Sequence, residues 1–196
     1  MKTYFTASAI AISLLFTACG ENSEKSKTVI TNKNTVANPS ESDNATPQNS
    51  VATQDIITGY LTLKNALAND KGKEAADASE KIVTSLEKLN EDAFTPAQKK
   101  LFNDVKEDMK EHAEHIADNS NNISHQREHF DIMSQDLIDL VESAGTNQTL
   151  YKVYCPMYNN NKGAFWLSES KEIKNPYLGQ KMPTCGEIKA EIKAKG

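Results

Sequence analysis

The chain has 196 residues, a net charge of −5 at pH 7, three cysteines and four histidines. Its length allows one domain with short appendages. It carries no basic stripe with interleaved aromatic residues, so we do not expect a nucleic-acid partner. It also lacks a phosphate-binding glycine loop, a zinc-protease helix motif and a serine-hydrolase elbow, and no nucleophile stands beside a base. We therefore do not expect an enzyme.

Residues 1–19 predict the signal peptide of a lipoprotein. Lys2 precedes an apolar run over residues 9–16, which is too short to span a bilayer because a span needs about 20 apolar residues. The run ends in Leu-Phe-Thr-Ala-Cys, which resembles the lipobox whose cysteine receives lipid. We predict that Cys19 anchors the protein in the cell envelope, in the outer membrane and facing the periplasm. An ordinary cleaved signal peptide that contains a cysteine is the alternative.

Residues 20–52 predict a disordered tether. Asn, Ser, Thr, Lys and Glu dominate this stretch, and it contains no aromatic residue. Such a segment cannot bury enough apolar surface to offset the entropy of ordering its backbone. The folded part is therefore expected to begin near residue 53.

Residues 53–145 predict four amphipathic helices. Apolar residues recur there at spacings of three and four, which is the helical period. Short turns between the segments favour an antiparallel up-and-down four-helix bundle. The expected buried stripes are Ile56, Tyr60, Leu63 and Leu67; Ala75, Ala78, Ile82, Leu86 and Leu89; Leu101, Val105, Met109, His112 and Ile116; and Ile123, Phe130, Met133, Leu137, Leu140 and Val141.

Two helix ends carry specific signals. Thr95-Pro96-Ala97-Gln98 is a capping box with proline at the first helical position, so the third helix should begin there. Gly145 follows the last apolar residues of the fourth segment and predicts a glycine C-cap.

All four histidines lie on either side of the turn between the third and fourth helices. In an antiparallel hairpin, His112 lies level with His129 and His115 lies level with His125. Spacings of three and four place each pair on one helix face, so the four imidazoles can converge. Imidazole nitrogen is a good ligand for zinc, copper and nickel.

Two other interpretations of the histidines stay open. Side chains near a polar turn are often solvated, and His112 lies on the apolar stripe, where it can be a satisfied core residue. Three nearby carboxylates are expected to be solvated rather than ligands; they belong to Glu111, Glu114 and Glu128.

Residues 146–196 predict a small C-terminal lobe, so the fold class is mainly α with a minor β part (α+β). Apolar and aromatic runs at 153–158 and 164–167 flank the turn sequence Asn-Asn-Asn-Lys-Gly, which is typical of a β-hairpin. A short helix or strand is expected over residues 187–195.

The lobe holds two cysteines, each with a methionine nearby: Cys155 with Met157, and Cys185 with Met182. Two thiols and two thioethers are soft ligands that favour Cu(I), with zinc or another thiophilic ion as an alternative. A disulfide between the cysteines is the competing interpretation, because exported proteins meet oxidising conditions. It would contribute about 3 kcal/mol.

These motifs together resemble a family of exported Bacteroidetes proteins with a domain of unknown function, DUF3347. The same domain is similar to a segment of periplasmic adaptor subunits of copper and silver efflux systems (CusB-like). The resemblance covers nearly everything from Asp55 to the end. It rests on residues 112–116, 123–130, 154–157, 163–168, 173–177 and 182–186.

The resemblance implies metal handling. We expect a lipid-anchored periplasmic protein that binds metal, with copper favoured, and that buffers the ion or delivers it to a heavy-metal efflux complex. Without the lipoyl and β-barrel domains of a complete adaptor, it is not expected to bridge a pump alone. The alternative is a structural or interaction module of the cell envelope with a Cys155–Cys185 disulfide and no metal.

Overall fold

A computed structural model of the chain describes residues 52–195. The predicted signal peptide, the lipidation site at Cys19 and nearly all of the predicted tether lie outside these residues. Among the described helices, none combines the length and the apolar character that crossing a membrane requires.

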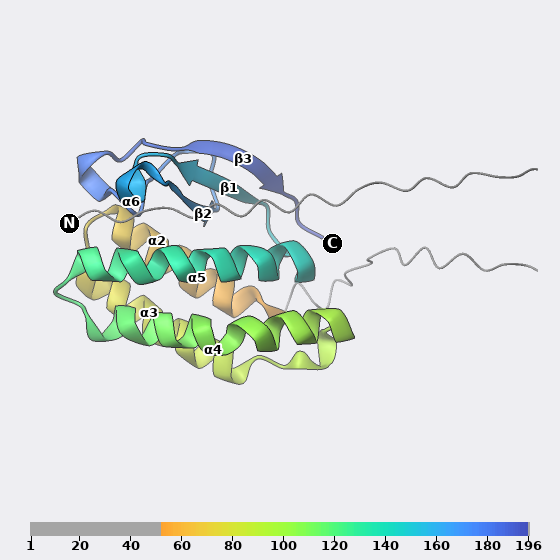
Figure 1. Cartoon of the computed structure of the whole chain (residues 1–196). Helices are drawn as coiled ribbons and strands as arrows, with labels where there is room; N and C mark the ends of the chain where they lie inside the picture. Colours follow the sequence, from red (N-terminus) through yellow and green to blue (C-terminus); the bar gives the residue numbers. More distant parts are fainter. Residues whose placement is uncertain (1–51, 196) are drawn as a thin grey trace, which may run out of the picture. The chain divides into compact units, whose positions relative to one another are not determined.

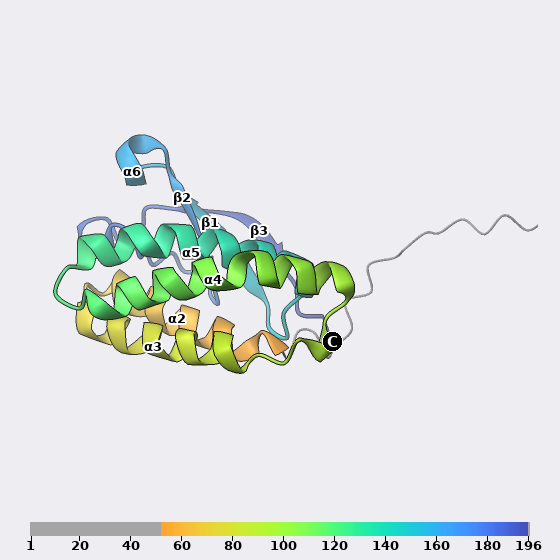
Figure 2. The same cartoon turned by 60° about the horizontal axis from the view of Figure 1, so that its bottom comes forward.

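Four long helices form the larger part of the fold (Figure 1). They are α2 (Gln54–Ala68), α3 (Gly72–Lys88), α4 (Pro96–Asp118) and α5 (Ile123–Ala144). Each helix packs against the next one along the chain, and Figure 2 shows the same up-and-down arrangement from a second direction. The prediction of an antiparallel four-helix bundle is confirmed.

The predicted helix ends are present. The Gln98 amide donates to Thr95 Oγ1 at 3.4 Å, and the Thr95 amide donates to Gln98 Oε1 at 2.9 Å, which completes the capping box of α4. Gly145 follows α5 with a φ of 87°, a left-handed conformation that glycine adopts without a steric cost. A short 3₁₀ turn, η1 (Glu91–Ala93), connects α3 to α4.

The buried face of α4 differs from the predicted stripe. Phe102 is fully buried, whereas Leu101 and Val105 are only partly buried. The physical reason is an aromatic pair: Phe102 packs edge-on against Phe94, with ring centroids 5.7 Å apart. This contact rotates the helix so that Phe102, Met109, Ala113 and Ile116 face the core.

The C-terminal residues form a three-stranded antiparallel sheet in the order β2-β1-β3. Strands β1 (Leu150–Cys155) and β2 (Ala164–Ser168) make the predicted hairpin, and β3 (Glu187–Ile192) settles the last element as a strand. Two short turns, α6 (Tyr158–Asn161) and η2 (Gly179–Lys181), lie between the strands. The sheet lies along one side of the bundle, with β2 against α5 and α2 (Figure 1).

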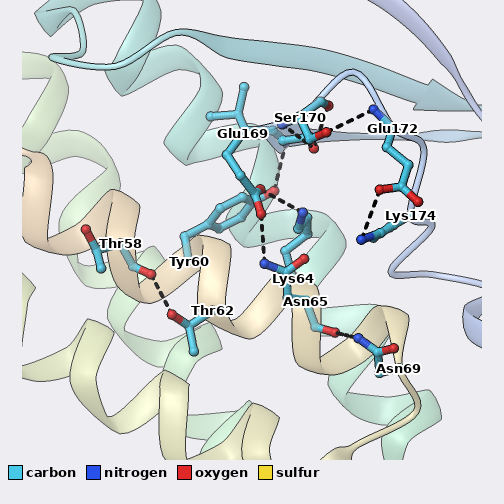
Figure 3. Close-up of polar contacts among 12 residues, drawn as sticks. Thr58, Tyr60, Thr62, Lys64, Asn65, Asn69, Glu169, Ser170, Glu172 and Lys174 are labelled. Atoms are coloured by element: carbon cyan, nitrogen blue, oxygen red, sulfur yellow. Dashed lines mark hydrogen bonds and ion pairs between the residues drawn. The ribbon is translucent and has the colours of Figure 1, made fainter.

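Hydrogen bonds join the sheet to the bundle (Figure 3). Lys64 Nζ on α2 donates to Glu169 Oε2 at 2.8 Å, and Asn65 Nδ2 donates to the other oxygen of that carboxylate at 2.9 Å. The Tyr60 hydroxyl lies 2.8 Å from Ser134 Oγ and accepts from the Leu167 amide at 3.2 Å. We call Lys64, Asn65 and Glu169 the clamp. Because the apolar core also runs without a break from the bundle into the sheet, the two parts hold each other in place.

Candidate metal centre

The four histidines lie at the turn end of the α4–α5 hairpin. His112 and His115 lie in the last turns of α4, and His125 and His129 lie in the first turns of α5. Asn122 caps α5 by accepting from the His125 amide at 3.3 Å. The polar turn and this cap therefore fix where α4 ends and where α5 begins. These two positions set the spacing of the histidines across the hairpin.

Two side chains between His125 and His129 hold this end of α5 in position. Gln126 is buried, and its amide group donates to the carbonyl oxygens of Ile116 at 3.0 Å and Gly72 at 2.9 Å. Arg127 donates to the carbonyl oxygen of Leu67 at 2.7 Å. It also donates to Pro176 O at 2.7 Å and pairs with Asp70 Oδ1 at 2.5 Å. The backbone that carries the histidines is thus tied to α2, to α3 and to the loop before η2.

His129 stands at the centre of the histidine cluster. Its Nδ1 lies 2.8 Å from His112 Nδ1, and its Nε2 lies 3.1 Å from His125 Nε2. The His115 ring stacks on the His129 ring at 4.4 Å with an interplanar angle of 7°. The cluster therefore connects both helices through one side chain.

Three histidines bring ligand atoms together. One ring nitrogen from each of His115, His125 and His129 lies within 4.8 Å of the other two. Among residues 52–195, these three side chains form the group of His, Cys, Asp and Glu residues that could hold a metal ion. In a tetrahedral site with metal–nitrogen bonds of about 2.0–2.1 Å, two ligand nitrogens stand about 3.3 Å apart. The 3.1 Å between His125 Nε2 and His129 Nε2 is close to that separation.

The solvent exposure of the histidine side chains increases from the inside of the cluster to the outside. The His112 side chain is 11% exposed, that of His125 is 34% exposed and that of His115 is 46% exposed. Burial lowers the pKa of His129, and the neighbouring His115, His112 and His125 lower it further. Neutral imidazole is the form that binds a metal ion, so the surroundings of His129 favour the ligand form.

Carboxylates face the outer ring nitrogens of the cluster. Asp108 Oδ1 lies 3.6 Å from His112 Nε2, Glu111 Oε1 lies 3.8 Å from His115 Nε2, and Glu128 Oε2 lies 3.5 Å from His125 Nδ1. Glu111 and Glu128 are exposed, as the sequence led us to expect, yet each faces a histidine. We did not predict these contacts from the sequence, although spacings of four and three residues on one helix indicate them.

The two predicted thiol ligands are not members of the histidine ligand group. Cys155 Sγ at the buried end of β1 lies 2.8 Å from Cys185 Sγ. Burial and the adjacent Cys155 thiol raise the pKa of the Cys185 thiol to about 11, which favours the protonated form at neutral pH. Met157 and Met182 are 51% and 42% exposed. The structure thus pairs the thiols with each other and does not join them to the histidines in one group.

A family model matches residues 56–149, which are α2 to α5 and the link to β1. Its description is protein of unknown function (DUF3347). The segment that matches DUF3347 holds all four histidines and ends before Cys155, so the Cys/Met lobe included in the expected resemblance lies outside it. No curated protein and no solved structure matches the chain.

Proposed function

We propose that the protein binds one transition-metal ion at the tip of the α4–α5 hairpin, through His115, His125 and His129. The observation that carries the proposal is the convergence of three ring nitrogens within 4.8 Å. Imidazole suits copper, zinc and nickel. Copper is the first candidate because the motifs resemble parts of copper and silver efflux systems.

The partial solvent exposure of the cluster favours an exchangeable metal ion rather than a structural one. Structural zinc sites are closed by four protein ligands, whereas a site with three protein ligands keeps a position for water or another molecule. His115 is nearly half exposed, so a fourth position on that side is open to solvent or to a partner.

The wider role follows from the same proposal. A lipid on Cys19 would hold the protein in the envelope, and a site with one open position can take up an ion and release it. We propose that the protein buffers copper in the periplasm or passes it to a heavy-metal efflux complex. The support is the lipobox-like sequence and the family resemblance, together with the exposed histidine cluster.

Metal titration tests the proposal. The purified protein is titrated with Cu²⁺ and Zn²⁺, and with Cu(I) under reducing conditions, and bound metal is counted. We expect one ion per chain, with binding lost in His129→Ala. Glu107→Ala is the control, because Glu107 is exposed on α4. A folded wild-type protein that takes up no ion would contradict the proposal, and so would uptake that the His129 variant leaves intact.

A second candidate function has its own observation. Cys155 Sγ and Cys185 Sγ are neighbours at 2.8 Å, a placement that favours a disulfide when the protein is exported. In that case the protein is a structural or interaction module whose C-terminal lobe is closed by a Cys155–Cys185 disulfide. Counting free thiols in protein isolated from the periplasm decides the point. If both thiols are free and bind Cu(I), Met157→Leu with Met182→Leu tests whether the thioethers contribute, as the sequence predicts.

A further inference from the structure

We propose that the histidine cluster contains an outer set of groups that fixes the tautomers of its ligands, and that His112 is a positioning residue and not a ligand. The outer set is His112 with Asp108, together with Glu128. This inference rests on the proposed function, and it assigns separate roles to four histidines that the sequence treats as equivalent ligands.

Each ring nitrogen of His125 faces a neighbouring side chain. Its Nε2 faces His129 Nε2 at 3.1 Å, and its Nδ1 faces Glu128 Oε2 at 3.5 Å. An ionised carboxylate can only accept a hydrogen bond. Glu128 therefore favours the tautomer with the proton on Nδ1, which leaves the Nε2 lone pair directed at His129.

Each ring nitrogen of His112 also faces a neighbouring side chain. Asp108 Oδ1 faces His112 Nε2 at 3.6 Å and favours a proton there, so His112 Nδ1 is an acceptor. That acceptor lies 2.8 Å from His129 Nδ1. His129 then donates from Nδ1 to His112, and its Nε2 lone pair is directed at His125.

Together these contacts favour tautomers that point two Nε2 lone pairs at one position. Two acceptors 3.1 Å apart repel each other unless a cation lies between them or one ring adopts its other tautomer. A metal ion removes that conflict, because both rings can then keep the tautomers that their outer neighbours favour. Metal-bound histidines commonly donate their other ring N–H to a carboxylate or another acceptor, which orients the ring and raises its basicity.

The same geometry explains why His112 is not in the ligand group. Its Nδ1 is used by His129 and its Nε2 faces Asp108, so neither nitrogen is directed at the position between His125 and His129. His112 is also the least exposed of the three histidines that have a carboxylate partner. It therefore acts on the metal through His129.

Two variants of His112 test the assignment. His112→Leu removes the acceptor for His129, whereas His112→Asn places a side-chain oxygen near the position of Nδ1 and keeps an acceptor there. Glu114→Gln is a control on the same helix, because Glu114 pairs with Lys110 and not with a histidine. For each protein, Zn²⁺ affinity is measured by competition, and the nitrogen donors of bound Cu²⁺ are counted by electron paramagnetic resonance.

We expect His112→Leu to weaken Zn²⁺ binding by roughly 10- to 100-fold with the number of nitrogen donors to Cu²⁺ unchanged. His112→Asn should recover most of the affinity, and Glu114→Gln should match the wild type. If both His112 variants lose one nitrogen donor, His112 is a ligand and the inference is overturned. It is overturned equally if His112→Leu binds as tightly as the wild type. A wild-type protein that binds no ion refutes the proposed function, and this inference falls with it.

Discussion

The clamp and the histidine cluster both gather titratable groups between elements, but they do so with opposite chemistry. In the clamp, Lys64 is 2% exposed and donates to Glu169, which also accepts from Asn65. Burial lowers the pKa of Lys64, and the hydrogen bond that Lys64 donates to Glu169 opposes that shift. Each group has a complementary partner, so the clamp needs nothing further to be stable.

The histidine cluster places like groups together. The neighbours of His129 lower its pKa, as burial does, so they disfavour a charge instead of balancing one. Folding gains little from such an arrangement, whereas a bound cation would gain several ligands at once. The difference teaches that complementary pairs join the parts of this fold, and that the group without an internal complement is the candidate for function.

The largest expected effect comes from breaking the clamp. Glu169→Ala leaves the buried Lys64 ammonium without its partner, and we expect the free energy of unfolding to fall by about 3 kcal/mol. Chemical denaturation measures it. Glu172→Ala is the control, because Glu172 makes an exposed pair with Lys174. The contrast between the clamp and the histidine cluster is wrong if Glu169→Ala leaves stability unchanged. It is also wrong if this variant stays folded but no longer binds metal.

Metal should stabilise the folded protein through the histidine cluster. At a free Zn²⁺ concentration of 100 times Kd, the expected gain is about 2.7 kcal/mol, because an ion that binds only the folded state shifts the equilibrium by mass action. Thermal unfolding with and without Zn²⁺ measures the shift. His129→Ala should show none. An equal shift in that variant would place the ion elsewhere.

The Asp136 carboxyl on α5 should cost stability at neutral pH. Burial raises its pKa to about 6, and Asp108 and Asp139 add to the shift. The unfolded chain loses this proton more readily, so the stability declines as the pH rises from about 4 to 6. We expect Asp136→Asn to stabilise the protein by about 1 kcal/mol at pH 7, a figure reduced because the residue is only partly buried. At pH 4 the gain should vanish; a gain of the same size at both pH values would assign it to another cause.

His129 should give a smaller pH dependence of the opposite sign. Because its pKa is lowered in the folded protein, the unfolded chain binds the proton more readily below about pH 6.5. Stability of the metal-free protein should therefore decline as the pH falls from 7 to 5. Denaturation of wild type and His129→Gln at both pH values tests this. If the variant keeps the full dependence, His129 is not its source.

The sequence predicted the helices and the hairpin because local signals determine them. The capping box at Thr95, the glycine after α5 and the apolar periodicity all act within one element. The rotation of α4 that buries Phe102 could not be predicted in this way, since it depends on contact with Phe94. The clamp was also missed, because Lys64 and Glu169 are 105 positions apart in the chain.

The candidate site was predicted in part. Counting from the turn places His112 level with His129, and the two do meet. Counting alone pairs His115 with His125, yet His115 lies closer to His129, at 4.4 Å against 6.1 Å between ring centroids. The reason is that helical side chains lean toward the N-terminus of their own helix. Those of α4 therefore lean away from the turn and those of α5 lean toward it, which brings His115 and His129 together.

X-ray absorption spectroscopy of the protein loaded with one equivalent of Zn²⁺ tests the central claim most directly. It identifies the atoms bound to the ion. Our account predicts a first shell of nitrogen or oxygen at about 2.0–2.1 Å, with the scattering pattern of three imidazoles. Sulfur at about 2.3 Å would instead place the ion at Cys155 and Cys185, and it would contradict the assignment of the site to His115, His125 and His129.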